Sequence, residues 1–205
     1  MKHLKTLLCL ALALCLLMSF TACSKKPAVV GNWTTTLELA NQMKEEIQGS
    51  DADGFLKDFE LDSFALLLNA EFKEDGTYTI SVDRESGETA IQNLKDALKQ
   101  PLRSYYESLG WDVDSMGMDL DSVVDNIFTE NNADDLYDDL EISGTYRLDG
   151  DKLYLSESAD EAPDEESYAV VEIQDDTFSI TELSGDDEQN ENLNKNLPLV
   201  FTRSN

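Results

Sequence analysis

The chain has 205 residues, of which 41% are hydrophobic, and it carries 43 acidic against 15 basic residues, a net charge of −28. This length suits one domain with a substantial core. The charge excludes nucleic acid as an expected partner and repels anionic lipid headgroups, because both carry the same sign as the protein.

The first 22 residues have the pattern of an export signal. Lys2 and Lys5 precede an apolar run from Leu7 to Met18, and small or moderately sized residues follow up to Ala22. A membrane-spanning helix needs about 20 apolar residues, and this run is shorter. We therefore predict a cleaved signal peptide at 1–22, with a retained membrane anchor as the alternative.

The segment from Phe20 to Cys23 resembles the lipobox of bacterial lipoproteins, in which small residues precede a cysteine. Thr21 and Ala22 fit that pattern, whereas Phe20 replaces the usual leucine. The resemblance implies that Cys23 receives a diacylglyceryl group and becomes the new N-terminus. The protein would then be exported and lipid-anchored at the outer face of the cell membrane, held there by acyl chains.

Cleavage before Cys23 would remove several chemical possibilities together with the signal. Cys9, Cys15 and His3 all lie in the signal, so the exported chain would contain no histidine and no second cysteine, and its net charge would be −30. Disulfides, Cys/His catalysis, Ser-His-Asp triads and histidine metal sites would be excluded. We expect no catalytic residues, no metal site and no cofactor; a hydrolase based on two carboxylates is the alternative.

The elements after the signal begin with a tether at 23–30 that contains Pro27. A strand is expected from Gly31, and apolar residues at helical spacing then predict a helix over about 37–48. Alternation from Phe64 to Phe72 predicts a strand. Asp75-Gly76 predicts a hairpin turn into a return strand at about 78–82.

A helical insertion is expected at about 88–140. An amphipathic stripe continues through the region and consists of Ile91, Leu94, Leu98, Leu102, Tyr105 and Leu109. Pro101 is expected to kink or restart this helix. Trp111 follows Gly110 in a loop, and Asp119 or Asp121 is expected to cap a further helix.

Strands resume at Ile142. Two hairpins are predicted, one turning at Asp149-Gly150 and one at Asp175-Asp176, and a last strand ends at Arg203. About eight strands joined by sequential hairpins predict an antiparallel meander. The expected fold class is mainly β (α+β), with one domain at 31–205.

Two features resemble lipocalins and their bacterial lipocalin-like relatives: Gly31-Asn32-Trp33 at the start of the first strand, and Arg203 at the end of the last. The resemblance implies an eight-stranded barrel in which Arg203 covers Trp33 and closes one end. A guanidinium over an indole is stabilising by about 0.5–2 kcal/mol. The strand pattern is also similar to that of uncharacterised lipoproteins of Gram-positive gut bacteria. The helical insertion departs from the lipocalin pattern.

Functional candidates are few. Trp111 and Tyr105 are possible ligand contacts, although aromatic residues at helical spacing more often pack between a helix and a sheet. The segment beginning at Asp112 has carboxylates near EF-hand positions but lacks the required final glutamate. Two hypotheses remain: a binding module for a small or amphipathic ligand, or an envelope structural or protein-interaction domain with a solid core.

Overall fold

A computed structural model of the chain describes residues 28–50, 55–56, 59–130, 141–163, 165–184, 194 and 196–204. The predicted signal peptide, Cys23 and most of the tether lie outside these residues. Eight strands form a closed antiparallel barrel in chain order, and β8 closes it against β1. They are β1 (Gly31–Glu38), β2 (Ala65–Phe72), β3 (Thr77–Val82), β4 (Ile142–Asp149), β5 (Lys152–Ser156), β6 (Tyr168–Gln174), β7 (Thr177–Ser184) and β8 (Leu199–Arg203).

The predicted hairpins form the barrel wall. Between β2 and β3, Asp75 accepts hydrogen bonds from the backbone and side chain of Thr77, and Gly76 adopts φ 85°. Gly150 adopts φ 65° between β4 and β5. Such left-handed backbone at a tight turn costs least at glycine. The sequence prediction of an eight-stranded, lipocalin-like barrel with helical parts is confirmed at the level of fold.

The first helix begins later than predicted. Leu37 and Glu38 belong to β1, where they pair with Leu66 and Ala65. Helix α2 then spans Ala40–Ser50. The prediction of helix from residue 37 is wrong because cross-strand pairing with β2 overrides the local helical spacing of apolar residues.

The longest helix, α3 (Arg84–Ser108), begins where Asp83 caps it by accepting a hydrogen bond from the Ser86 backbone at 2.9 Å. The helix continues through Pro101, so the predicted restart does not occur. Helix α4 (Leu120–Glu130) follows Asp119, whose carboxylate accepts from the Asp121 backbone. The rest of the predicted insertion, 131–140, lies outside the described residues. No described helix has the length and apolar character needed to cross a membrane.

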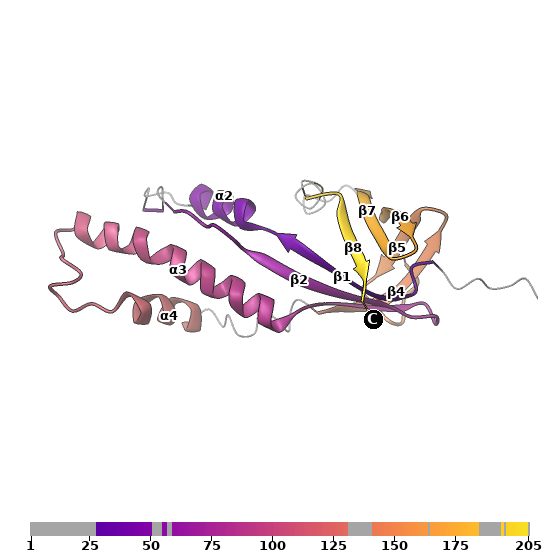
Figure 1. Cartoon of the computed structure of the whole chain (residues 1–205), viewed down its shortest axis with the longest axis horizontal. Coiled ribbons are helices and arrows are strands. Elements are labelled where there is room, and N and C mark those ends of the chain that lie inside the picture. The colour runs from indigo at the N-terminus through magenta and orange to yellow at the C-terminus, as the bar shows by residue number, and fades with distance from the viewer. Residues whose placement is uncertain are drawn as a thin grey trace, which may run out of the picture.

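The molecule is elongated, with the barrel at one end and the three described helices at the other (Figure 1). The β1–β2 ladder joins the two parts: β8 pairs only with Trp33 and Thr34 of β1, and β3 pairs only as far as Leu68 of β2. The remainder of both strands therefore extends beyond the barrel. Helices α2 and α3 pack on this extension through a second core centred on Phe59, Phe64, Leu66, Ala90 and Leu94.

Candidate functional site

Trp33 and Arg203 lie together at the end of the barrel where the described chain enters it. The two residues are opposite each other in the β1–β8 ladder, and Trp33 is fully buried. The Arg203 guanidinium carbon lies 4.1 Å from the indole centroid. The indole N–H donates to the carbonyl oxygen of Val29 at 2.7 Å. The structure thus brings together the two residues that the sequence resemblance paired.

Gly31 has a steric reason to be glycine. Its φ is 142°, and a Cβ at this position would collide with Nη1 of Arg203. Arg203 is held there because Nη1 donates to the Val30 carbonyl at 3.1 Å and Nε donates to the Asp175 carbonyl at 3.3 Å. The Gly-x-Trp segment therefore supplies both the ring and the space that the guanidinium needs.

Aromatic side chains from five strands lie in the barrel interior next to this closure. Phe72 contacts Tyr78, Tyr146 and Phe178, with ring centroids 6.0, 5.1 and 6.0 Å apart. Phe178 also stacks on Phe201 at 4.4 Å. The Tyr146 hydroxyl is satisfied by donating to the Lys73 carbonyl at 2.7 Å. Small barrels are commonly filled in this way, and the contacts leave this part of the interior occupied by the protein itself.

The helical arm is the other candidate region. It comprises α3, α4 and the loop 109–119 between them. A row of basic residues on one face of α3 pairs with aspartates: Lys95 with Asp125, Lys99 with Asp121 and Arg103 with Asp114. Residues 95, 99 and 103 are spaced by four, so they share a helix face. The three ion pairs link the loop and α4 to α3 at the surface, beside the buried core of Leu102, Val113, Leu120 and Val124.

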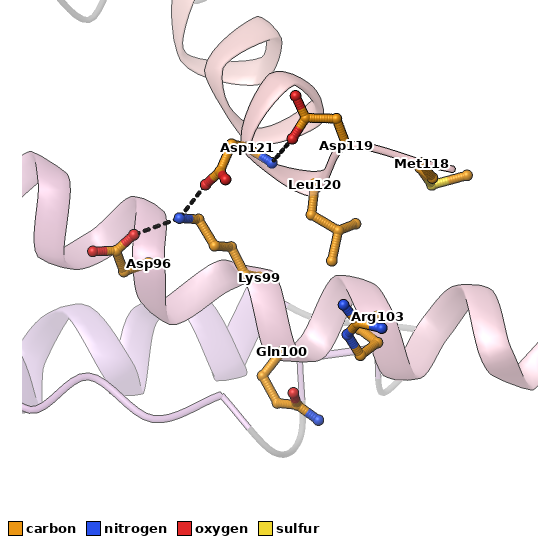
Figure 2. Close-up of a pocket in the computed structure, with 8 residues that line it drawn as sticks. All are labelled: Asp96, Lys99, Gln100, Arg103, Met118, Asp119, Leu120 and Asp121. Carbon is orange, nitrogen blue, oxygen red and sulfur yellow. Dashed lines mark hydrogen bonds and ion pairs between the residues drawn. The ribbon is translucent and has the colours of Figure 1, made fainter. Parts of the chain in front are cut away.

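An open cleft of about 500 Å³ lies between α3 and α4, lined in part by Lys99 and Arg103 (Figure 2). Two basic residues beside a cleft favour an anion site only if their charges are unpaired. Lys99 contacts Asp96 and Asp121, and these hydrogen bonds raise its pKa. Arg103 is bound to Asp114 at 2.9 Å. The cleft is therefore a salt-bridged helix junction and supplies no cationic site for an anion.

Backbone hydrogen bonds order the loop at the end of the arm. The Trp111 backbone N–H donates to the Tyr106 carbonyl at 3.0 Å, and that of Met116 donates to Asp112 at 2.9 Å. Val113 is buried in a third core between α3 and α4. The Trp111 ring stacks on Tyr106 with centroids 5.8 Å apart and an interplanar angle of 8°. The Trp111 ring therefore lies against Tyr106 of α3 on one face.

Four large apolar side chains are exposed at this end of the molecule. We call them the distal patch: Tyr105 (43% exposed), Leu109 (51%), Trp111 (46%) and Met116 (57%). They are four of the seven exposed large hydrophobic residues in the part of the chain that the structure describes. All four fall within residues 105–116, and Tyr106 contacts both Tyr105 and Trp111. Contiguous exposed apolar groups mark interaction surfaces in soluble proteins.

The sequence anticipated only part of this arrangement. Trp111 is exposed in a loop, as expected, and Tyr105 is exposed at the end of α3; their role as ligand contacts stays a prediction. The prediction that the aromatic residues pack between helix and sheet is wrong for Tyr105, which is exposed and contacts Phe55. The neighbouring Tyr106 joins the core between the helices. The sequence analysis did not predict that Leu109 and Met116 are exposed. Each of them is followed by a glycine, Gly110 or Gly117, which indicates a turn in the sequence and adopts a positive φ in the structure.

Carboxylates accompany the distal patch. The Asp112 carboxylate accepts hydrogen bonds from the hydroxyl and backbone of Ser115, and these bonds lower its pKa. The stabilisation is present above the pKa of the unfolded state and is lost as the pH falls through the lower folded pKa. Asp114 is bound to Arg103. No group of three acidic, histidine or cysteine residues suited to a metal occurs among the described residues.

No family model, curated protein or solved structure matches this chain. Cys23, the predicted lipidation site, lies outside the described residues. The candidate site is therefore defined by the geometry of the arm and its distal patch alone.

Proposed function

We propose that the protein is an exported, lipid-anchored interaction module that presents the distal patch to a protein partner outside the cell membrane. In this proposal Cys23 holds the chain on the membrane, the barrel forms the base, and the helical arm carries the contact surface outward. The observation that supports it most is the location of the distal patch at the end of the molecule opposite the entry of the chain.

The chain direction supports this orientation. Val29 and Val30 lie against Trp33 and Arg203 at the closed end of the barrel. From there β1 runs toward the helices, and α3 extends the molecule further, by about 37 Å for its 25 residues at 1.5 Å per residue. An anchor a few residues before Val29 would therefore lie at the barrel end, and the distal patch would point away from the membrane (Figure 1).

The composition of the distal patch also supports binding to a protein. Tryptophan, tyrosine and methionine are enriched in interfaces, and tryptophan and tyrosine supply much of the binding energy at hot spots. Trp111 is already oriented by its stacking on Tyr106 and its backbone hydrogen bond. A side chain that is fixed before binding loses less conformational entropy on binding.

The alternative of a small ligand inside the barrel receives less support. Binding pockets for small molecules are typically 300–1,000 Å³ in volume and are lined largely by apolar groups. In this barrel, Phe72, Tyr146, Phe178 and Phe201 contact one another across the interior beside the Trp33 closure. The filled part of the interior beside Trp33 and the exposed patch favour the second of the two functions expected from the sequence, an interaction domain.

Replacement of Cys23 by serine is expected to abolish lipid anchoring, because serine lacks the thiol that receives the lipid. The variant should leave the membrane fraction for the medium or persist as an uncleaved precursor. Fractionation of host cells and intact-mass measurement would check this. Parent-like fractionation and processing of the Cys23→Ser variant would contradict the anchoring proposal.

A photo-crosslinking residue placed at Leu109 in host cells is expected to capture a discrete protein partner. The matched control is Val200, an exposed apolar residue on the barrel with 46% exposure. The Trp111→Ala substitution should reduce the product formed from Leu109, because it removes the largest side chain of the distal patch. Mass spectrometry of the crosslinked species provides the measurement.

Two results would count against an interaction through the distal patch. The first is that neither Leu109 nor Met116 gives a crosslinked product when the protein is anchored. The second is the formation of the same product from Val200, which would indicate non-directional contact. Retention of the Leu109 product after Trp111→Ala would exclude Trp111 as an anchor residue.

A further inference from the structure

The distal patch lies in the most one-sided charge environment of the arm. Residues 104–130 contain seven acidic residues and no lysine or arginine. Glu107, Asp112 and Asp114 fall within the same stretch as the patch residues, and all three are exposed. Arg103 pairs with Asp114, which leaves Glu107 and Asp112 without an ion pair among the described residues. The apolar groups are therefore accompanied by net negative charge.

We infer that the distal patch binds a cationic amphipathic segment of its partner, one with leucine-like residues on one face and lysine or arginine beside them. This inference rests on the proposed function and specifies the chemistry of the partner. The apolar face would cover Leu109, Trp111 and Met116, and the cations would approach Glu107 and Asp112. Such complementarity steers association and sets specificity.

A second copy of this chain fits the surface poorly. Two chains that each carry a net charge of −28 would bring carboxylates of the same sign together around the apolar contact. Like charges placed against each other across an interface oppose association. An anionic lipid surface is disfavoured for the same reason, so the observed charge favours a basic protein segment over both.

Hydrogen bonds from Ser115 orient the Asp112 carboxylate. The Ser115 hydroxyl donates to one oxygen of Asp112 at 2.7 Å and the Ser115 backbone donates to the other at 3.1 Å. The Asp112 carboxylate is thus held by Ser115 next to Trp111 in the chain. A partner cation at this position would gain a charge-assisted hydrogen bond in addition to long-range attraction.

The test uses the full-length lipidated protein in nanodiscs of zwitterionic phosphatidylcholine. The chain has two tryptophans, Trp33 and Trp111, so labelling with 5-fluorotryptophan gives two fluorine NMR resonances. Trp33 is fully buried in the barrel and serves as an internal control. The probe is a twelve-residue leucine/lysine peptide with helical amphipathic spacing. The controls are a leucine/glutamate peptide of the same pattern and a serine/lysine peptide of the same charge.

The leucine/lysine peptide is expected to shift the Trp111 resonance and leave that of Trp33 in place. The serine/lysine peptide should bind at least tenfold more weakly, and the leucine/glutamate peptide should not bind. Leu109→Ser and Met116→Ser should each weaken binding severalfold. Glu107→Gln together with Asp112→Asn should also weaken it and should flatten its dependence on salt, because fewer screened charge interactions remain.

Three outcomes would overturn the inference: equal binding of the leucine/lysine and leucine/glutamate peptides, equal binding of the serine/lysine peptide, or no effect of peptide on Trp111. A Trp111 shift caused by phosphatidylglycerol in the nanodisc, without peptide, would indicate a lipid contact and would also overturn it. Failure of the peptide with continued crosslinking at Leu109 in cells would reject the cationic partner and retain the proposed function. If the peptide does not bind and Leu109 gives no crosslinked product, the cationic partner and the proposed function are both rejected.

Discussion

Replacement of Trp33 by alanine is expected to lower the free energy of unfolding by about 3–5 kcal/mol, the usual cost of truncating a large aromatic residue in a core. Trp33 is fully buried and its ring meets Phe178 edge-on at 5.1 Å. The substitution would also leave the Val29 carbonyl without its indole donor and Arg203 without the ring beneath it. Against a typical stability of about 5–15 kcal/mol, this is a large fraction.

Urea denaturation followed by far-ultraviolet circular dichroism provides the measurement, because fluorescence would lose its reporter. Trp111→Ala is the matched control and should cost less than about 1 kcal/mol, since Trp111 is 46% exposed. Arg203→Ala should cost about 1 kcal/mol in the parent and less in the Trp33→Ala background, as expected for a contact worth about 0.5–2 kcal/mol. Equal costs of Trp33→Ala and Trp111→Ala would contradict the account of barrel closure.

The barrel could be predicted from the sequence because its signals are local. Alternation from Phe64 to Phe72 determines which face of β2 is buried, and Asp75-Gly76 fixes a hairpin. Each such hairpin brings neighbouring strands together without information from distant residues. The closure of β8 on β1 required a long-range inference, which came from the resemblance of Trp33 and Arg203 to a lipocalin pair.

The position of the distal patch could not be predicted in the same way. The apolar stripe of α3 continues from Ile91 through Leu102 to Tyr105 and Leu109 with unchanged periodicity. Leu94 and Leu102 are buried against other elements, whereas Tyr105 near the end of the helix and Leu109 directly after it are exposed. Periodicity indicates which face of a helix is apolar, and it contains no information on whether another element covers that face. The exposed end of the stripe is therefore visible only in three dimensions.

Gly144 is another residue whose role the sequence did not reveal. It lies in β4, pairs with Tyr78 of β3, and is buried. A Cβ at this position would overlap the carbonyl oxygen of Ser156 at the end of β5. The obstacle is backbone, which cannot rotate aside as a flexible side chain can. The β5 backbone can therefore approach β4 this closely only when residue 144 has no side chain.

Gly144→Ala is accordingly expected to lower the free energy of unfolding by about 3 kcal/mol or more, the upper end of the usual cost of overpacking. The matched control is Gly49→Ala in α2, where a Cβ would meet no atom within 4 Å. That change should raise stability by about 0.5–1 kcal/mol, because alanine is the better helix former. Urea titrations of both variants compare the two changes directly. A neutral Gly144→Ala variant would show that β4 and β5 separate at little cost, and that their close approach does not constrain the barrel.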